Sequence, residues 1–151
     1  MQDYDALITK TTQYAAKLLK KPDQCKMVAL CSHLFYRGDV SSPNKYHDPK
    51  RVLECLQRSL KIADGCMASS THVHLFVSIL NVYLYYFELG CPAIQDKYIT
   101  GLIALISEHV DGMDHGEARA KVEESYGATL KYIKRKKEEG ETMEKFKAIQ
   151  V

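Results

Sequence analysis

The stretch STHVHLFVSILNVYLYYFE, from Ser70 to Glu88, is the most apolar part of this chain. Its twelve hydrophobic residues lie nearly all the way round the predicted helix instead of forming one stripe. A helix that is apolar on every side is either buried on every side or spans a membrane. This stretch is rich in Tyr, Asn and His, whereas a membrane span needs about 20 predominantly apolar residues. It therefore predicts a buried helix that begins with Ser70 or Thr71 as its N-cap and runs to Gly90, and other helices must cover it.

Length and charge indicate one folded domain of ordinary composition. The chain has 151 residues, of which 46% are hydrophobic and 26% are charged, and this is enough to bury a core. The formal net charge of +2 is too small to imply nucleic acid or an acidic membrane surface as the main partner.

The cysteines indicate reduced thiols packed in a core. Their number is odd and no two have CxxC spacing, so we expect neither a disulfide framework nor a zinc site; they are Cys25, Cys31, Cys55, Cys66 and Cys91. This usage is typical of a cytoplasmic protein. The first residues carry acids and no apolar segment, so we expect no signal peptide, and the chain opens directly into a helical pattern.

Helical periodicity and turn residues predict six helices and no strand. The helices are expected at about 2–21, 22–36, from Asp48-Pro49 to about 67, 70–90, 92–110 and 117–139. Residues 37–48 form the longest irregular stretch. Short connections make consecutive helices antiparallel neighbours, so the helices are expected to pair as three hairpins. In the first two pairs the second helix is the more apolar, which is typical of a two-layer α-solenoid of degenerate, HEAT-like repeats. We therefore expect an all-α solenoid fragment over residues 1–139 and a flexible tail over residues 140–151.

Several side chains that could bind a metal ion or act in catalysis are better explained by ordinary roles in helices and turns. His72 and His74 are two residues apart, so a helix points them about 200° apart and they cannot easily share a metal ion; the same spacing argues against a Cys31–His33 nucleophile pair. His109 and His115 flank a turn. Acidic residues interleave with the basic run from Lys131 to Lys137, which is typical of a solvated helix end. We find no catalytic or phosphate-binding motif, so we expect no enzyme activity, no metal and no cofactor.

Two groups of residues can each be interpreted either as structural or as part of a surface that binds a partner. Lys17, Lys20 and Lys21 crowd the turn between the first two predicted helices, where complementing the dipole of the first helix, together with solubility, is the simpler explanation. The segment His33-Leu34-Phe35-Tyr36-Arg37 closes a helix that is apolar all round, and it can be core. However, the inner helices of a two-layer solenoid keep one face that no layer of their own chain covers, and a docked partner would bury it.

Several quoted segments resemble the C-terminal region of the large vacuolar-protein-sorting subunit of retromer. They are LLKKPDQC (Leu18–Cys25), CSHLF (Cys31–Phe35), RVLECL (Arg51–Leu56), LKIA (Leu60–Ala63) and ILN (Ile79–Asn81). The likeness is strong over about residues 5–90 and rests on helical pattern alone beyond them.

The resemblance implies a scaffold and not an enzyme. It implies a HEAT-like solenoid in an endosomal sorting coat for retrograde endosome-to-Golgi transport, located in the cytoplasm and peripheral on endosomes. The C-terminal region of that family cradles the small retromer subunit, which has a metallophosphoesterase fold. The residues implied in this cradle are Leu30, His33, Leu34, Phe35 and Tyr36. Lys17, Lys20 and Lys21 match a basic patch where two large subunits meet. The alternative is a self-contained helical-repeat domain with another protein partner.

Overall fold

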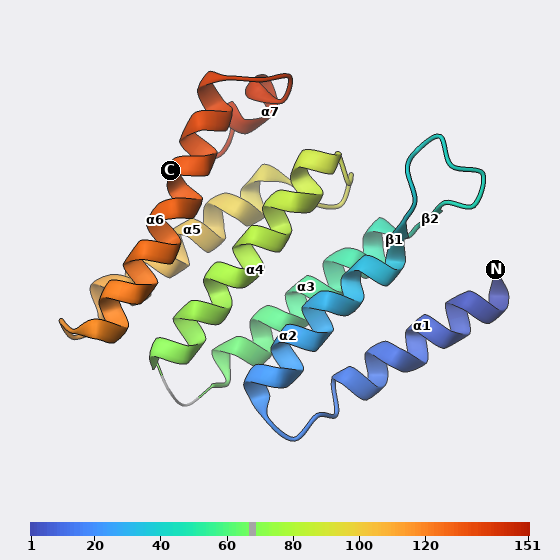
Figure 1. Ribbon diagram of the computed structural model, residues 1–151, viewed down its shortest axis with the longest axis horizontal. Helices are drawn as coiled ribbons and strands as arrows, with labels where there is room; N and C mark the ends of the chain where they lie inside the picture. The colour runs from blue at the N-terminus through green and yellow to red at the C-terminus, as the bar shows by residue number, and fades with distance from the viewer. Residues whose placement is uncertain (67–68) are drawn as a thin grey trace. The chain divides into compact units, whose positions relative to one another are not determined.

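A computed structural model describes residues 1–66 and 69–151. The chain divides into two compact units, Met1–Cys66 and Met67–Val151, which are called the N-terminal and the C-terminal unit below. Figure 1 shows that both units are built from helices. The all-α architecture expected from the sequence is therefore confirmed.

The N-terminal unit contains three α-helices with the middle one enclosed by the others. They are α1 (Gln2–Ala15), α2 (Lys21–Cys31) and α3 (Pro49–Asp64), and α2 packs on both α1 and α3 (Figure 1). Val28 on α2 and Val52, Leu56 and Ala63 on α3 are fully buried. These residues form the core that fixes α2 in place.

The start of α3 follows the sequence prediction. The Asp48 side chain caps the helix by accepting a hydrogen bond from the Arg51 backbone N–H at 3.2 Å, and Pro49 occupies the first turn. An Asp cap followed by Pro satisfies the free N–H groups of a helix start without losing a helical hydrogen bond.

The ends of α1 and α2 differ from the prediction. Helix α1 ends at Ala15, not near Lys21. Pro22 lies in the first turn of α2, so the residues before it must form the connection that reverses the chain. Helix α2 ends at Cys31 and continues as a 3₁₀ helix, η1 (Ser32–Phe35).

A short antiparallel pair of strands, absent from the prediction, follows η1. Strand β1 (Tyr36–Arg37) pairs with β2 (Tyr46–His47), with Tyr36 opposite His47. Two residues per strand are too few to give a periodic pattern in sequence. The pair closes the base of the stretch that was expected to be irregular.

The packing of the C-terminal unit explains how the apolar stretch from Ser70 to Glu88 is buried. Helix α4 (Ser69–Leu89) packs on both α5 (Asp96–Asp111) and α6 (Glu117–Glu138). Phe76, Tyr83 and Tyr86 are at most 1% exposed. Ser78, Asn81, Tyr85 and Leu89 are exposed and recur at helical spacing, so one narrow strip of α4 faces solvent.

Two predicted boundaries in this unit need correction. Helix α4 begins at Ser69, so Ser70 and Thr71 lie inside its first turn and do not cap it; consecutive Ser and Thr residues can each cap, and the sequence does not select one. Helix α5 begins at Asp96, four residues after the predicted start, because a backbone hydrogen bond from Ile94 to Cys91 (3.1 Å) closes a turn there.

The last twelve residues, expected to form a flexible tail, contain a fourth helix of this unit. Helix α7 (Met143–Lys147) buries Phe146 completely, and Ile149 beyond it is also buried. The Phe146 ring meets the Phe87 ring edge-on at 5.2 Å. Residues three apart share one face of a helical turn, so Phe146 and Ile149 together attach the segment to its unit. The predicted pairing of the third and fourth helices spans the two units and stays a prediction.

Candidate partner-docking surface

Helix α2 exposes large apolar side chains on one side only. Met27 is 40% exposed, Leu30 is 58% exposed and Leu34, just beyond the helix, is half-buried. Cys25 and Val28 lie on the opposite side and are buried. The three outer residues are spaced by three and four positions, which places them along one side of the helix. We call Met27, Leu30 and Leu34 the α2 ridge.

The residues of η1 divide between this surface and the core. His33 and Leu34 are half-buried, whereas Phe35 is 3% exposed. The Arg51 guanidinium lies over the Phe35 ring, 5.1 Å from its centroid, and the Phe35 carbonyl accepts a hydrogen bond from the Asp48 N–H at 2.8 Å. Phe35, predicted to contact a partner, thus lies in the core, where it supports the neighbouring residues.

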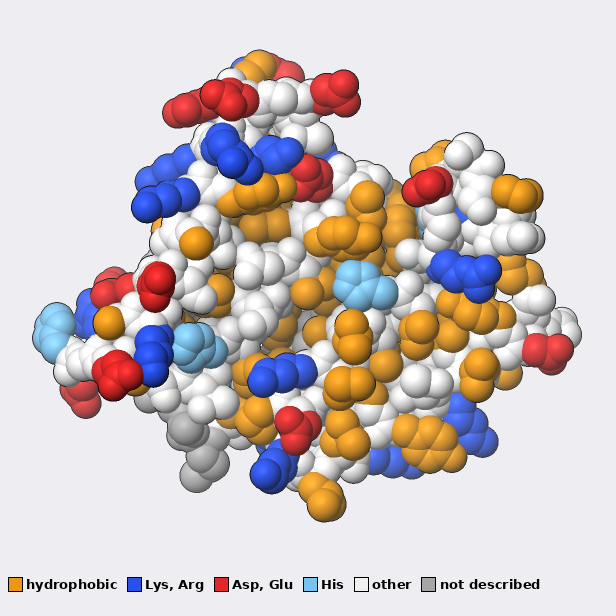
Figure 2. Space-filling model, viewed as in Figure 1, with side chains coloured by type: hydrophobic (Ala, Val, Ile, Leu, Met, Phe, Trp, Pro, Cys, Tyr) orange, Lys and Arg blue, Asp and Glu red, His pale blue; other side chains and the backbone are white. Residues whose placement is uncertain are grey.

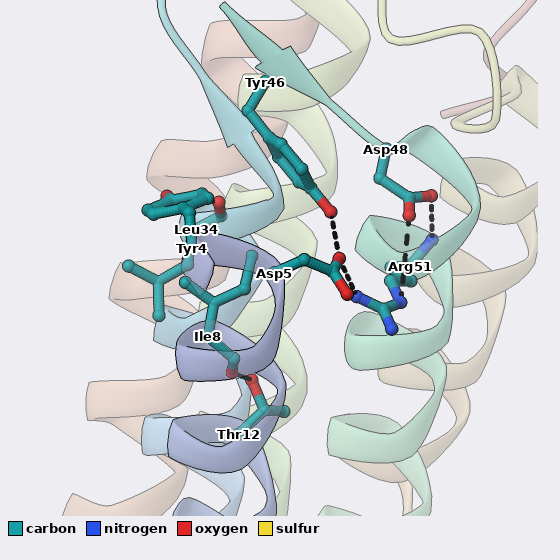
Figure 3. A network of polar contacts seen from close by, with 8 residues as sticks. All are labelled: Tyr4, Asp5, Ile8, Thr12, Leu34, Tyr46, Asp48 and Arg51. Carbon is teal, nitrogen blue, oxygen red and sulfur yellow. Dashed lines mark hydrogen bonds and ion pairs between the residues drawn. The ribbon is translucent and has the colours of Figure 1, made fainter. Parts of the chain in front are cut away.

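A polar network braces η1 from two other elements (Figure 3). The Tyr4 hydroxyl on α1 donates to the Leu34 carbonyl at 2.7 Å. Asp5, one residue further, accepts from Arg51 on α3 at 2.7 Å and also from the Tyr46 hydroxyl on β2. This network, which the sequence alone did not indicate, holds the backbone of Leu34 between α1 and the start of α3.

The strand pair fixes the far side of the same surface. The Tyr36 ring stacks on the His47 ring, with centroids 3.9 Å apart and planes 5° from parallel. The His47 imidazole is 2.6 Å from the Gly38 carbonyl through Nε2, and Gly38 has φ +82°, a conformation that glycine adopts without strain. Tyr36, predicted to contact a partner, is half-buried at this anchored base.

Burial favours the uncharged forms of His33 and of two core cysteines. Desolvation lowers the pKa of His33, which favours the uncharged imidazole at neutral pH. Burial likewise raises the pKa of the Cys25 thiol to about 11 and that of Cys55 to about 12. The α2 ridge and His33 contribute apolar or uncharged side chains to this surface, with the exposed Lys26 beside Met27, and an apolar centre next to polar groups is suited to burial against another protein.

A small cavity lies behind this surface, inside the N-terminal unit. It has a volume of about 230 Å³ and its walls include Thr9, Val28, Phe35, Cys55 and Arg58. Thr9 Oγ1 is buried without a hydrogen-bond partner among the described residues. The cavity is smaller than typical small-molecule sites of about 300–1,000 Å³, and the described residues contain no group of three metal-ligating side chains.

The predicted basic patch lies on the turn between α1 and α2. Lys17, Lys20 and Lys21 are all exposed and form no ion pair among the residues that the structure describes. Lys21 also lines an open hollow of about 630 Å³ with Gln57, Arg58, Lys61 and Ile62. Arg58 and Lys61 line the same hollow as Lys21 although they are about forty residues away in the chain, so their proximity was not predicted.

For two of these lysines, the structure contradicts the expected stabilisation of the first helix through its dipole. Helix α1 ends at Ala15 and has no basic residue in its last turn, while Lys20 is the N-cap of α2 and Lys21 its first residue. Positive charge at a helix N-terminus opposes the helix dipole by about 0.3–1 kcal/mol. Lys20 and Lys21 therefore do not stabilise either helix through its dipole.

Comparison with known proteins identifies the family. A family model described as vacuolar protein sorting-associated protein 35 matches residues 1–109. This chain belongs to that family. A vacuolar protein sorting-associated protein 35 from Schizosaccharomyces pombe is 53% identical over 113 residues, which cover 73% of this chain and 13% of the relative.

Two further relatives extend the match. Vacuolar protein sorting-associated protein 35B from Arabidopsis thaliana is 43% identical over 159 aligned positions, covering 100% of this chain and 20% of the relative. A vacuolar protein sorting-associated protein 35 from Dictyostelium discoideum is 34% identical over 113 residues, covering 74% of this chain and 14% of the relative. The chain thus spans about a fifth or less of the length of these vacuolar protein sorting-associated protein 35 relatives. Among the described residues, no helix is both long and apolar enough to cross a membrane.

Proposed function

We propose that this chain is the C-terminal part of the large scaffold subunit of retromer, and that the α2 ridge with His33 docks the small metallophosphoesterase-fold subunit. The retromer role, the position within the longer protein and this partner follow from the family resemblance. The proposed setting is a coat for retrograde endosome-to-Golgi transport, peripheral on the cytoplasmic side of endosomes. Its role there is mechanical assembly and not catalysis.

One observation carries the docking proposal. Leu30 is 58% exposed near the end of α2, between the buried residues Ala29 and Cys31, and the backbone that follows it is held by hydrogen bonds to Leu34 and Phe35 from α1 and from Asp48. A pre-organised apolar surface loses little conformational freedom when a partner binds. Complete burial of a large apolar side chain contributes about 1.5–3 kcal/mol, and each partly exposed ridge residue can contribute part of this when a partner covers it.

The basic patch supports a second part of the proposal, association between two large subunits. Lys20 and Lys21 oppose the dipole of α2 instead of complementing it, so helix stability does not account for their charge. Unpaired, exposed cations are suited to steering and orienting an acidic partner surface. We infer that the acidic counterpart belongs to another large subunit.

Isothermal titration calorimetry with the purified small subunit tests the docking proposal. We expect Leu30→Ser, and Leu34→Asp combined with His33→Ala, each to lower the affinity at least tenfold, because they remove apolar area or place a charge in the contact. Val40→Ser is the matched control, since Val40 is 76% exposed in the same unit and lies outside the ridge. Equal affinities for all four proteins, with helicity unchanged by circular dichroism, would contradict the proposal.

A further inference from the structure

A basic hollow lies between the start of α2 and the end of α3, inside the N-terminal unit. Its volume is about 630 Å³, and the described side chains that line it are Lys21, Gln57, Arg58, Lys61 and Ile62. Helices α2 and α3 pack on each other, and Figure 1 draws the start of α2 beside the end of α3. Figure 2 shows exposed lysine or arginine side chains at the lower edge of the view, where Figure 1 draws this end of the unit. Of the five described lining residues, three are cations and none is acidic.

Contacts within the unit do not account for the charge of this hollow. Lys21, Arg58 and Lys61 form no ion pair among the residues that the structure describes. Lys21 is the first residue of α2, where a positive charge opposes the helix dipole, whereas Lys61 complements the dipole in the last turn of α3. Arg58 and Lys61 are three positions apart on α3, so they are neighbours on one face and their like charges repel. A bound anion would compensate the positive charge that these side chains bring together.

The other lining residues restrict which anion fits. The described lining contains no aromatic ring, so a nucleotide base would have nothing on which to stack. Ile62 is the one apolar side chain in that lining, which is too little for the side-chain pockets that hold a peptide. The Gln57 amide can donate hydrogen bonds to hydroxyl groups and accept hydrogen bonds from them. These features together suit a small polyol that carries phosphate groups.

We propose that this hollow binds an inositol ring that carries two or more phosphate groups. The Arg58 guanidinium binds one phosphate through two parallel N–H groups, and the Lys21 and Lys61 ammonium groups bind another as point charges. Each phosphate carries about 1.5–2 negative charges at neutral pH, so two phosphates balance the three cations. The volume of the hollow lies within the range of about 300–1,000 Å³ that is usual for small-molecule sites. The same chemistry belongs to a soluble inositol phosphate and to the headgroup of a phosphoinositide lipid.

Isothermal titration calorimetry of the full-length protein with inositol 1,4,5-trisphosphate tests the inference. We expect Arg58→Gln to lower the affinity at least tenfold, because it removes a charge-assisted pair of hydrogen bonds. Arg58→Lys keeps the charge and should lose less. Lys50→Gln is the matched control, since it removes one charge from an exposed side chain at the start of α3, outside the hollow, and should leave the affinity within about twofold of the parent. An unchanged affinity for Arg58→Gln, or an equal loss for Lys50→Gln, would overturn the inference.

Vesicle sedimentation separates the two sources of the ligand. Vesicles that contain phosphatidylinositol 4,5-bisphosphate are compared with phosphatidylserine vesicles of equal total charge, for the parent and for Arg58→Gln. A preference for the phosphoinositide that Arg58→Gln abolishes identifies the lipid headgroup, whereas binding of the soluble trisphosphate without that preference identifies a soluble inositol phosphate. If the protein binds neither the trisphosphate nor the phosphoinositide in preference to phosphatidylserine, the hollow is not such a site. Arg58 and Lys61 lie outside the α2 ridge, so Arg58→Gln should bind the small subunit as the parent does, and failure of this inference leaves the docking proposal standing.

Discussion

Tyr4 and Asp5 show how adjacent residues on α1 reach two different elements of the same unit. The Tyr4 hydroxyl binds the Leu34 carbonyl, while the Asp5 carboxylate binds Arg51 and Tyr46. Neither contact can be read from the sequence, because the partners are 30 to 46 positions away. The consequence is that the shape of the α2 ridge depends on residues outside it.

Replacing Tyr4 by Phe removes one hydrogen bond and keeps the ring. We expect the free energy of unfolding to fall by about 0.5–1.5 kcal/mol, because the Leu34 carbonyl loses its donor. Urea denaturation followed by circular dichroism measures this loss. Tyr14→Phe is the control, since Tyr14 is 63% exposed. Equal losses for the two variants would show that the bond from Tyr4 contributes nothing.

Glu88, in the C-terminal unit, makes the stability of the folded protein depend on pH. Hydrogen bonds first from Lys136, at 2.7 Å, and then from the Tyr132 hydroxyl lower the pKa of Glu88. A carboxyl with a lowered folded pKa stabilises the protein at any pH above its unfolded pKa of about 4.3, and that stabilisation disappears as the pH falls through the folded pKa.

We therefore expect Glu88→Gln to be less stable than the parent at pH 7 and equally stable well below pH 4. Denaturant titrations from pH 2.5 to pH 7 measure the difference. Glu124→Gln, a change at an exposed glutamate, should show no such dependence on pH. A difference for Glu88→Gln that stays constant over this range would rule out the lowered pKa as its cause.

At the scale of elements, α7 is the helix whose role is most easily tested. Only five residues long, it is attached through Phe146, which contacts Phe87, while the Lys145 ammonium binds the Phe87 carbonyl. We expect Phe146→Ala to remove amide protection from residues 143–149 in hydrogen exchange and to leave α4, α5 and α6 protected, because short helices depend on tertiary packing. Lys147→Ala, an exposed change on the same helix, is the control. Full protection of α7 in Phe146→Ala would contradict this role.

The sequence predicts the helices well and their ends less well. The Asp48-Pro49 start of α3 was predicted because side-chain capping is a local interaction. The early end of α1 was missed, because the need for a five-residue connection before Pro22 arises from the antiparallel packing of α1 and α2. A different limit applies to α2 and α4, since apolar residues that surround most of a helix give no clear period that separates a buried side from an exposed one.

The lack of a clear apolar period in α2 explains which parts of the candidate site could be predicted from the sequence. Leu30 and Phe35 are equally apolar in sequence, yet Leu30 is 58% exposed and Phe35 is 3% exposed. The difference comes from the change to a 3₁₀ helix at Ser32 and from the packing of Arg51 on Phe35. The three lysines were recognised from the sequence, but their position at the start of α2 required the structure.

At the scale of the molecule, the two units divide the apolar surface differently. In the C-terminal unit α5 and α6 cover α4 and leave a narrow exposed strip. In the N-terminal unit α1 and α3 cover α2 and leave the α2 ridge. The helix that decides the fold is therefore mainly structural, and we propose that the partner docks on the shorter helix α2.

Hydrogen exchange of this chain with and without the purified small metallophosphoesterase-fold subunit tests that proposal most directly. We expect the subunit to increase protection of amides within residues 27–36, while the exposed loop around Val40 stays unchanged. The segment is already fixed in the free chain, because the Leu34 and Phe35 carbonyls accept hydrogen bonds from the Tyr4 hydroxyl and from the Asp48 N–H, so the added protection would report contact with the partner and not folding of the segment. No added protection over residues 27–36 at saturating subunit would contradict docking on the α2 ridge and would favour a self-contained helical-repeat domain.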